Sequence, residues 1–127
     1  MIVLDASAAV AALLRDGSAR ESAAREQLHA PHLIDAEVAQ TLRRLVSAGR
    51  LPAHAGKHLL LEWSALALVR HPAHPLLPHI WALRENVTAY DATYVALAEA
   101  LGCALLTADT RLARAPGTTC PVTVVAS

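Results

Sequence analysis

The chain has 127 residues, enough for one domain with its own hydrophobic core. Eleven basic residues balance eleven acidic ones, so the net charge is zero. This excludes a strong overall attraction to a polyanion, so that any binding of nucleic acid must depend on a local group of basic residues. Two cysteines exclude a disulfide framework, and the absence of a signal peptide or of an uncharged apolar stretch near ~18 residues predicts a soluble cytoplasmic protein with no membrane span.

The first part of the chain alternates short apolar runs with helical patterns. Residues 1–4 form a continuous apolar run, which is typical of a strand buried in a parallel sheet. Val38, Leu42 and Leu45 follow helical spacing, and Gly49 marks the stop of that helix. In chain order we expect a strand at 1–4, a helix at 6–14, a polar helix at 18–28, a strand at 32–34 and a helix at 36–48.

The rest of the chain continues this alternation. Pro52 is tolerated in the first turn of a helix, and Gly102 is placed to end the best-defined helix. In chain order we expect a helix at 52–63, a strand at 66–69, a proline-rich loop at 71–78, helices at 79–84 and 88–101, a strand at 104–107, a helical turn at 110–113 and a strand at 122–125. Strands that alternate with helices predict a single α/β domain over residues 1–127, with a five-stranded parallel sheet and helices on both faces.

Four acidic residues lie where an apolar stretch gives way to a helical pattern: Asp5, Glu37, Asp91 and Asp109. Ligands of an open parallel sheet bind beyond the carboxyl ends of its strands, so we expect these acids to converge there. Each acid also has a structural interpretation, since Asp5 and Asp109 are placed to cap helices, and Thr88 with Asp91 is close to a capping box. A cap contributes only ~1 kcal/mol, whereas two carboxylates several ångströms apart repel by about 1–4 kcal/mol. A cluster of four therefore indicates a site for a hard divalent cation.

Asp35 is a fifth acid that competes with Glu37 for a place in this site. The two residues are separated by about 200° around a helix, so they do not both face one point. We interpret Asp35 as the cap of the helix and Glu37, inside the first turn, as the acid of the site. The reverse assignment is the alternative.

Arginine supplies ten of the eleven basic residues. Its planar guanidinium matches two phosphate oxygens at once, which suits recognition of a nucleic-acid backbone. Arg43, Arg84 and Arg111 flank the acidic motifs and are candidates for binding substrate phosphates. For any one of them a solvated surface position is the simpler interpretation.

Histidines also occur in pairs, His54 with His58 and His71 with His74. Imidazole is a good zinc ligand, so a zinc site is one reading of these pairs. No cysteine lies near either pair, and we favour histidines exposed on a helix and a loop.

Four motifs cover nearly the whole chain: VLDASA at 3–8, HLIDAEV at 32–38, TAYDATYVALA at 88–98 and LTAD at 106–109. Each motif alone is weak, but their order and spacing form a specific set. Together they resemble PIN-domain ribonucleases, and most closely the VapC toxins of bacterial toxin–antitoxin pairs. The resemblance implies a five-stranded parallel sheet and an endoribonuclease site that depends on Mg²⁺ or Mn²⁺.

The resemblance also implies roles for individual residues. The implied catalytic acids are Asp5, Glu37, Asp91 and Asp109. Asp5, Asp91 and Asp109 would hold the metal, with Glu37 positioning or deprotonating the attacking water, and either one or two ions are compatible with this set. The hydroxyls of Ser7 and Thr107 match positions that line such sites. The implied partners are an RNA substrate, a VapB-like antitoxin and a second copy of the chain, giving a homodimer and a toxin–antitoxin hetero-oligomer.

Two other functions are compatible with the pattern. The first is an Asp-based phosphohydrolase or phosphotransferase, in which Asp5 after the first strand is a nucleophile. Such enzymes need a second acid two residues later, where this chain has Ser7. The second is a non-catalytic module of the same fold that binds RNA or protein.

Overall fold

The computed structural model describes residues 1–126. Its elements in chain order are β1 (Ile2–Leu4), α1 (Ala6–Leu14), α2 (Ser18–Arg25), β2 (Leu28–Pro31), α3 (Leu33–Ser47), α4 (Ala53–Ala65), β3 (Leu68–His71), the 3-10 turn η1 (His74–Leu76), α5 (Leu77–Ala82), α6 (Ala89–Leu101), β4 (Ala104–Thr107), α7 (Thr110–Arg114) and β5 (Val122–Val124). The strands form one parallel sheet in the order β3-β2-β1-β4-β5, which confirms the predicted fold class. None of the helices within residues 1–126 is both long and apolar enough to span a membrane.

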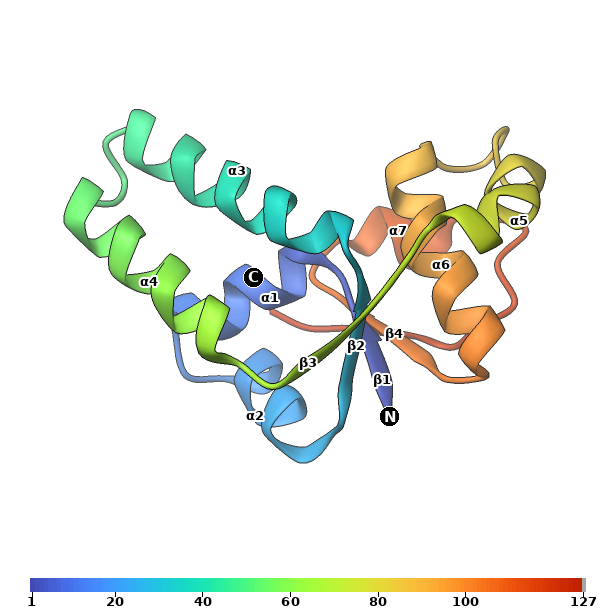
Figure 1. The fold of residues 1–127 in the computed structure, drawn as a ribbon, viewed down its shortest axis with the longest axis horizontal. Helices are drawn as coiled ribbons and strands as arrows, with labels where there is room; N and C mark the ends of the chain where they lie inside the picture. Colours follow the sequence, from blue (N-terminus) through green and yellow to red (C-terminus); the bar gives the residue numbers. More distant parts are fainter. Residues whose placement is uncertain (127) are drawn as a thin grey trace.

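The sheet is covered on both faces, as Figure 1 shows: α1 to α4 lie on one side and α5 and α6 on the other. The core is aliphatic, and its central strand β1 is buried along its whole length. Helix α6 packs against the sheet through small residues, among them Ala92, Ala96 and Ala98, each fully buried. Small side chains let the helix axis approach the strands closely, so one flank of α6 is held firmly against the sheet.

The carboxyl ends of β1 and β4 lie side by side. Leu4 pairs with Leu106, and the next residue, Asp5, donates its N–H to the Leu106 carbonyl at 3.0 Å. The chain then leaves β1 into α1 and leaves β4 into α7, so that the junctions carrying Asp5 and Asp109 are neighbours although they are a hundred residues apart in sequence. The parallel sheet thus forms the edge at which a site was predicted.

Some predicted boundaries in the first half were wrong. The second strand is β2 at Leu28–Pro31 and not at residues 32–34, and α3 begins at Leu33 and not at residue 36. The apolar pair Leu33 and Ile34 suggested a strand, but Ile34 is fully buried from the first turn of a helix. β2 was hidden because it contains His29, whose ring nitrogen lies 2.8 Å from a ring nitrogen of His71 in the neighbouring strand β3.

Three smaller shifts have related causes. Helix α2 ends at Arg25, three residues before the predicted end, because Leu28 belongs to β2. β3 starts two residues later than expected, since it pairs in register with the relocated β2. Helix α5 starts at Leu77 and has Pro78 in its first turn, where the missing N–H of proline costs no helical hydrogen bond.

Candidate active site

Asp5 is the most buried of the four acids, with 6% of its surface exposed. It caps α1, because its Oδ1 accepts the Ala8 N–H at 2.9 Å, and the same oxygen accepts the Ser7 hydroxyl at 2.6 Å. The Thr107 hydroxyl donates to Oδ2 at 2.5 Å. Burial raises the pKa of Asp5, while these hydrogen bonds oppose the rise. A carboxylate held through both oxygens is fixed in place and poorly suited to nucleophilic attack, which disfavours the phosphotransferase alternative.

The hydroxyls of Ser7 and Thr107 tie the two strand ends together. Each donates to Asp5, and each also accepts a backbone N–H from the β4–α7 junction: Ser7 from Ala108 at 2.9 Å, across the two strand ends, and Thr107 from Asp109 at 3.0 Å, within its own junction. Thr107 is fully buried. The two residues predicted to support the site therefore hold Asp5 in one orientation and join the β1–α1 junction to the β4–α7 junction.

Asp91 lies in the first turn of α6, half-buried, where Thr88 caps the helix by accepting the Asp91 N–H at 3.2 Å. Burial raises the pKa of Asp91, and the negative charges of Asp5, Asp109 and Glu37 raise it further. The other three acids are thus near enough for their charges to act on this carboxylate. The four predicted acids converge on one region of the molecule.

Asp109 caps α7 by accepting the Arg111 N–H at 2.9 Å, and the Arg111 side chain folds back onto the same carboxylate at 3.3 Å. Burial raises the pKa of Asp109, but the hydrogen bonds and charge of Arg111 outweigh this effect and lower it overall. The Arg111 side chain is 90% exposed, so the pair is weak and is easily exchanged for another anion.

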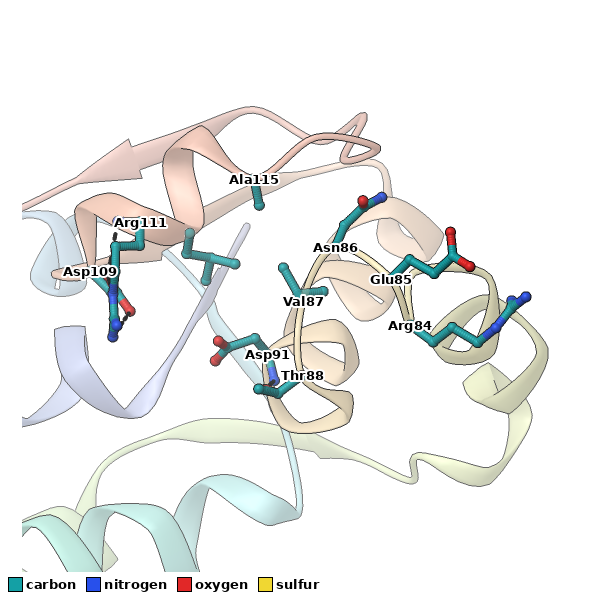
Figure 2. A pocket seen from close by; sticks show the side chains of 10 residues that line it. Arg84, Glu85, Asn86, Val87, Thr88, Asp91, Asp109, Arg111 and Ala115 are labelled. Carbon is teal, nitrogen blue, oxygen red and sulfur yellow. Dashed lines mark hydrogen bonds and ion pairs between the residues drawn. The ribbon is translucent and has the colours of Figure 1, made fainter.

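A pocket of about 510 Å³ opens beside these residues. Figure 2 shows Asp91 and Asp109 projecting toward the same space from α6 and from the start of α7, with Arg84 and Glu85 directed away from it. The pocket is lined by Arg84, Glu85, Asn86, Val87, Thr88, Asp91, Asp109, Arg111, Leu112 and Ala115. Asp5 and Glu37 are not part of this lining. Of the four acids, only Asp91 and Asp109 therefore line the open space.

Glu37 is the fifth residue of α3, so it lies just beyond the first turn in which it was predicted, because the helix begins at Leu33. Its Oε1 accepts the hydroxyl of Tyr94 at 2.5 Å, and Tyr94 is 1% exposed. Sequence reasoning assigned no role to Tyr94, although it lies three residues after Asp91 and hence on the same side of α6. That spacing was the signal that could have identified it.

Asp35 does not cap α3, so that prediction was wrong. Its two oxygens accept hydrogen bonds from the Arg70 guanidinium at 2.7 and 2.9 Å, and Oδ1 also accepts the Trp63 indole N–H at 2.8 Å. The hydrogen bonds from Arg70 hold the pKa of Asp35 below its usual value. Asp35 therefore joins α3 to α4 and β3. Glu37 is instead the acid of α3 that lies near the site, because its negative charge raises the pKa of both Asp91 and Tyr94.

The three candidate arginines are placed differently. Arg111 lies in the pocket, and Arg84 lies at its rim with its guanidinium 4.8 Å from the centre of the Trp81 ring. Arg43 hydrogen-bonds to Gln40 and lines a separate depression between α3 and α4. The structure thus brings Arg111 to the acids, while Arg84 borders the pocket but points away from it.

The donor set at the pocket fits a hard cation in its chemistry. Mg²⁺ binds through one or two protein carboxylates and keeps several waters. Asp109 alone among the four acids has an ion-pair partner in residues 1–126, and the carboxylate of Asp91 is destabilised by its acidic neighbours. As the side chains lie, no three histidines, cysteines or acids of the described chain are arranged to hold one ion together. This applies equally to the histidine pairs and to the four acids, so any ion at the acids would keep water among its ligands.

The raised pKa of Asp91 gives a prediction for the metal-free protein. At pH 7 the ionised carboxylate is less favourable in the folded than in the unfolded chain, so Asp91→Asn should raise the free energy of unfolding by about 1 kcal/mol. The gain should shrink as the pH falls through the raised pKa and vanish below 3.8, where the carboxyl is protonated in both states. Urea unfolding of both proteins with EDTA present, at several pH values, measures this difference. A gain that persisted at low pH would contradict the electrostatic account.

Comparisons with known proteins agree with this fold. The sequence model of one family, described as the PIN domain, matches residues 2–117. The chain is 56% identical over 125 residues to "Ribonuclease VapC9" of Mycobacterium tuberculosis, covering 98% of both proteins. Among solved structures it is similar to PAE2754 from Pyrobaculum aerophilum, with a TM-score of 0.71, 26% identity and coverage of 95% of this chain and 81% of that one. It also shares its fold with VapBC2 from Rickettsia felis bound to a promoter DNA fragment, with a TM-score of 0.70, 15% identity and coverage of 98% and 99%.

Proposed function

Because this chain belongs to the PIN-domain family, and within it to the VapC ribonucleases, we propose that it is a metal-dependent endoribonuclease and the toxin of a toxin–antitoxin pair. Its reaction is the hydrolysis of RNA phosphodiester bonds with Mg²⁺ or Mn²⁺ as the cation. The observation that carries the proposal is the convergence of Asp5, Glu37 and Asp109 on Asp91, whose pKa is raised mainly by burial and further by their three negative charges. Such a concentration of negative charge costs folding free energy and is expected where a cation neutralises it.

In this proposal each acid has a distinct task. Asp91 and Asp109 project into the pocket, and with Asp5 they hold the cation directly or through water. When bound, the cation polarises the phosphoryl oxygen, makes water a better nucleophile and steadies the leaving oxygen. Glu37 positions or deprotonates the attacking water with the carboxylate oxygen that Tyr94 does not occupy. Arg111 binds a substrate phosphate next to the acids, whose negative charges would otherwise repel that phosphate.

Incubating the protein with end-labelled structured RNAs, in Mg²⁺ and in EDTA, tests this function. We expect cuts only when the cation is present. By resemblance to the family, the products should carry a 5′-phosphate and a 3′-hydroxyl. Specific RNA binding without any cuts in Mg²⁺ or Mn²⁺ would instead favour the non-catalytic module.

Metal binding also predicts a change in thermal stability. Mg²⁺ or Mn²⁺ should raise the melting temperature, because a ligand at a hundred times its dissociation constant adds about 2.7 kcal/mol to the stability of the folded state. The double substitution Asp5→Asn, Asp91→Asn should remove most of this response. Thermal unfolding with and without the cation measures it, and equal responses in the double variant and the wild type would rule out a metal at these acids.

We further propose that a VapB-like antitoxin covers the site. An apolar groove of about 450 Å³ runs between α1 and α3, beginning at Ser7 and lined by residues that include Val10, Leu14 and Leu45. A tail lying in this groove would reach the acids, where an Arg or Lys of the antitoxin can pair with several carboxylates. The net charge of zero gives little long-range steering, so most of the affinity should come from apolar contact.

This arrangement separates inhibition from binding. Replacing the basic residue of the antitoxin tail by alanine should restore RNA cleavage, while the complex should survive with a dissociation constant raised by roughly tenfold. Calorimetry and cleavage assays on the same pair measure the two effects. Loss of all binding in that variant, together with dissociation of the wild-type pair at high salt, would show that charge dominates the interface. Mass measurement of the free toxin tests the proposed homodimer.

A further inference from the structure

The only polar atom of the Tyr94 side chain, its hydroxyl oxygen, lies among the acids of the site. Its ring is 1% exposed and belongs to the core beneath α6, where a phenylalanine would fill the same volume. Its hydroxyl donates to Glu37 Oε1 at 2.5 Å, joining α6 to α3 across 57 residues of sequence. Packing alone does not require this hydroxyl.

The surroundings of Tyr94 keep its hydroxyl a hydrogen-bond donor. Burial raises the pKa of Tyr94 far above its ordinary value, and the hydrogen bond to Glu37 and the negative charges of Glu37, Asp5 and Asp91 raise it further. The phenol therefore stays protonated wherever the protein is folded. Within a group of acids that mainly accept hydrogen bonds, it is a fixed donor aimed at one carboxylate oxygen.

We propose that Tyr94 is the positioning residue for Glu37: it holds Oε1 so that Oε2 alone is presented to the attacking water. This inference rests on the proposed nuclease function and assigns a new residue to it. A glutamate has three rotatable bonds, and without an anchor the repulsion from Asp5 and Asp91 would favour rotamers that point away from the site. Anchoring one oxygen removes those rotamers before substrate arrives.

The position of Tyr94 in the helix adds to this role. Asp91 and Tyr94 are three residues apart in α6, so they project from adjacent turns on the same side. One rigid helix, packed through alanines against the sheet, thus carries both a proposed cation ligand and the anchor of the proposed base. The distance between cation and base is set by the helix and does not depend on a loop.

Tyr94→Phe tests the proposal because it removes only the hydroxyl. We expect kcat for RNA cleavage to fall by roughly 10- to 100-fold, as for other residues that orient a catalytic group, with KM and the Mg²⁺ dependence unchanged. Tyr90→Phe is the matched control, since Tyr90 lies four residues earlier in the same helix and is 63% exposed. A wild-type kcat in Tyr94→Phe would overturn the proposal, and so would an equal loss in the control.

A double-mutant cycle shows whether the hydroxyl acts through Glu37. Single-turnover rates are compared for Glu37→Gln and for Glu37→Gln combined with Tyr94→Phe, with enzyme in excess over RNA. We expect no further loss in the double variant, because the residue that Tyr94 orients is already disabled. Losses that multiply would mean that Tyr94 acts on another group, which overturns the proposal.

The contact itself is measurable without any RNA. Proton NMR of the wild-type protein should show a downfield hydroxyl resonance of Tyr94, slow to exchange with water, which shifts in Glu37→Gln. A freely exchanging hydroxyl in the folded wild type would overturn the inference, whether or not RNA is cut. A wild-type protein that shows the resonance but never cleaves RNA would refute the proposed function and leave the Tyr94–Glu37 contact standing.

Discussion

RNA cleavage is expected to fall by about three orders of magnitude or more when Asp5, Glu37 or Asp91 is replaced by alanine. Each substitution removes a group with its own place in the site: the fixed carboxylate at the end of β1, the partner of Tyr94, or the pocket acid on which the other three act. Cleavage of labelled RNA, and the relief of growth arrest when the variants are expressed, measure the loss.

Asp16→Ala and Glu62→Ala are the matched controls for these three variants. Both acids are exposed and make local pairs away from the site, with Arg20 and His58 respectively. They should retain full activity. Asp5→Ala also loses a helix cap, worth about 1 kcal/mol, so its circular dichroism must show a folded protein before its activity is interpreted. Substantial cleavage by folded Asp91→Ala would remove the pocket from the proposed site.

Asp35→Ala should have the opposite effect, with lost stability and retained cleavage. The substitution leaves the Arg70 guanidinium and the buried Trp63 indole without their shared acceptor. We expect a loss of about 1–3 kcal/mol in the free energy of unfolding, toward the lower end because the Asp35 side chain is 44% exposed. Urea unfolding measures the loss.

Asp16→Ala is again the control, since it breaks an ion pair whose carboxylate is 93% exposed and should change stability by less than about 0.5 kcal/mol. The pair of variants also decides between the two acids of α3. Full activity in Glu37→Ala, together with a folded but inactive Asp35→Ala, would exchange the roles assigned to them.

The sequence predicted best those elements whose limits depend on local chemistry. Helix α1 was predicted over its observed range because Asp5 caps it and the residues after it are apolar, and α6 ends at Gly102, which adopts a left-handed conformation with φ of 66°. β2 was misplaced because its identity depends on a partner: His29 is tolerated in a buried strand only because His71 and Gln27 accept or donate to its ring. No local pattern carries that information.

The same distinction holds for the site. Asp5 and Asp109 follow strand ends, and Asp91 and Glu37 lie near the starts of helices, so a parallel sheet was enough to predict that they converge. The true partners of Asp35 lie 28 and 35 residues away, and nothing near Asp35 in the sequence indicates that Trp63 and Arg70 will reach it. Arg43 and Arg111 both flank an acidic motif, but only the rotation of α3 and α7 against the sheet decides which of them faces the pocket.

The hydrogen bonds of the Ser7 and Thr107 hydroxyls, which join the two strand ends, have a consequence for synthesis of the protein on the ribosome. Asp5 is among the first residues to emerge from the ribosome. The hydrogen-bond donor to its Oδ2, the hydroxyl of Thr107, is synthesised 102 residues later. During synthesis, which proceeds N-terminus first, the nascent chain therefore lacks the strand that completes its acidic edge. A truncated product that ends before Ala104 has no β4, no Thr107 and no Asp109. We therefore expect the proposed nuclease activity to be absent from incomplete chains, because the topology of the sheet delays completion of the acidic edge.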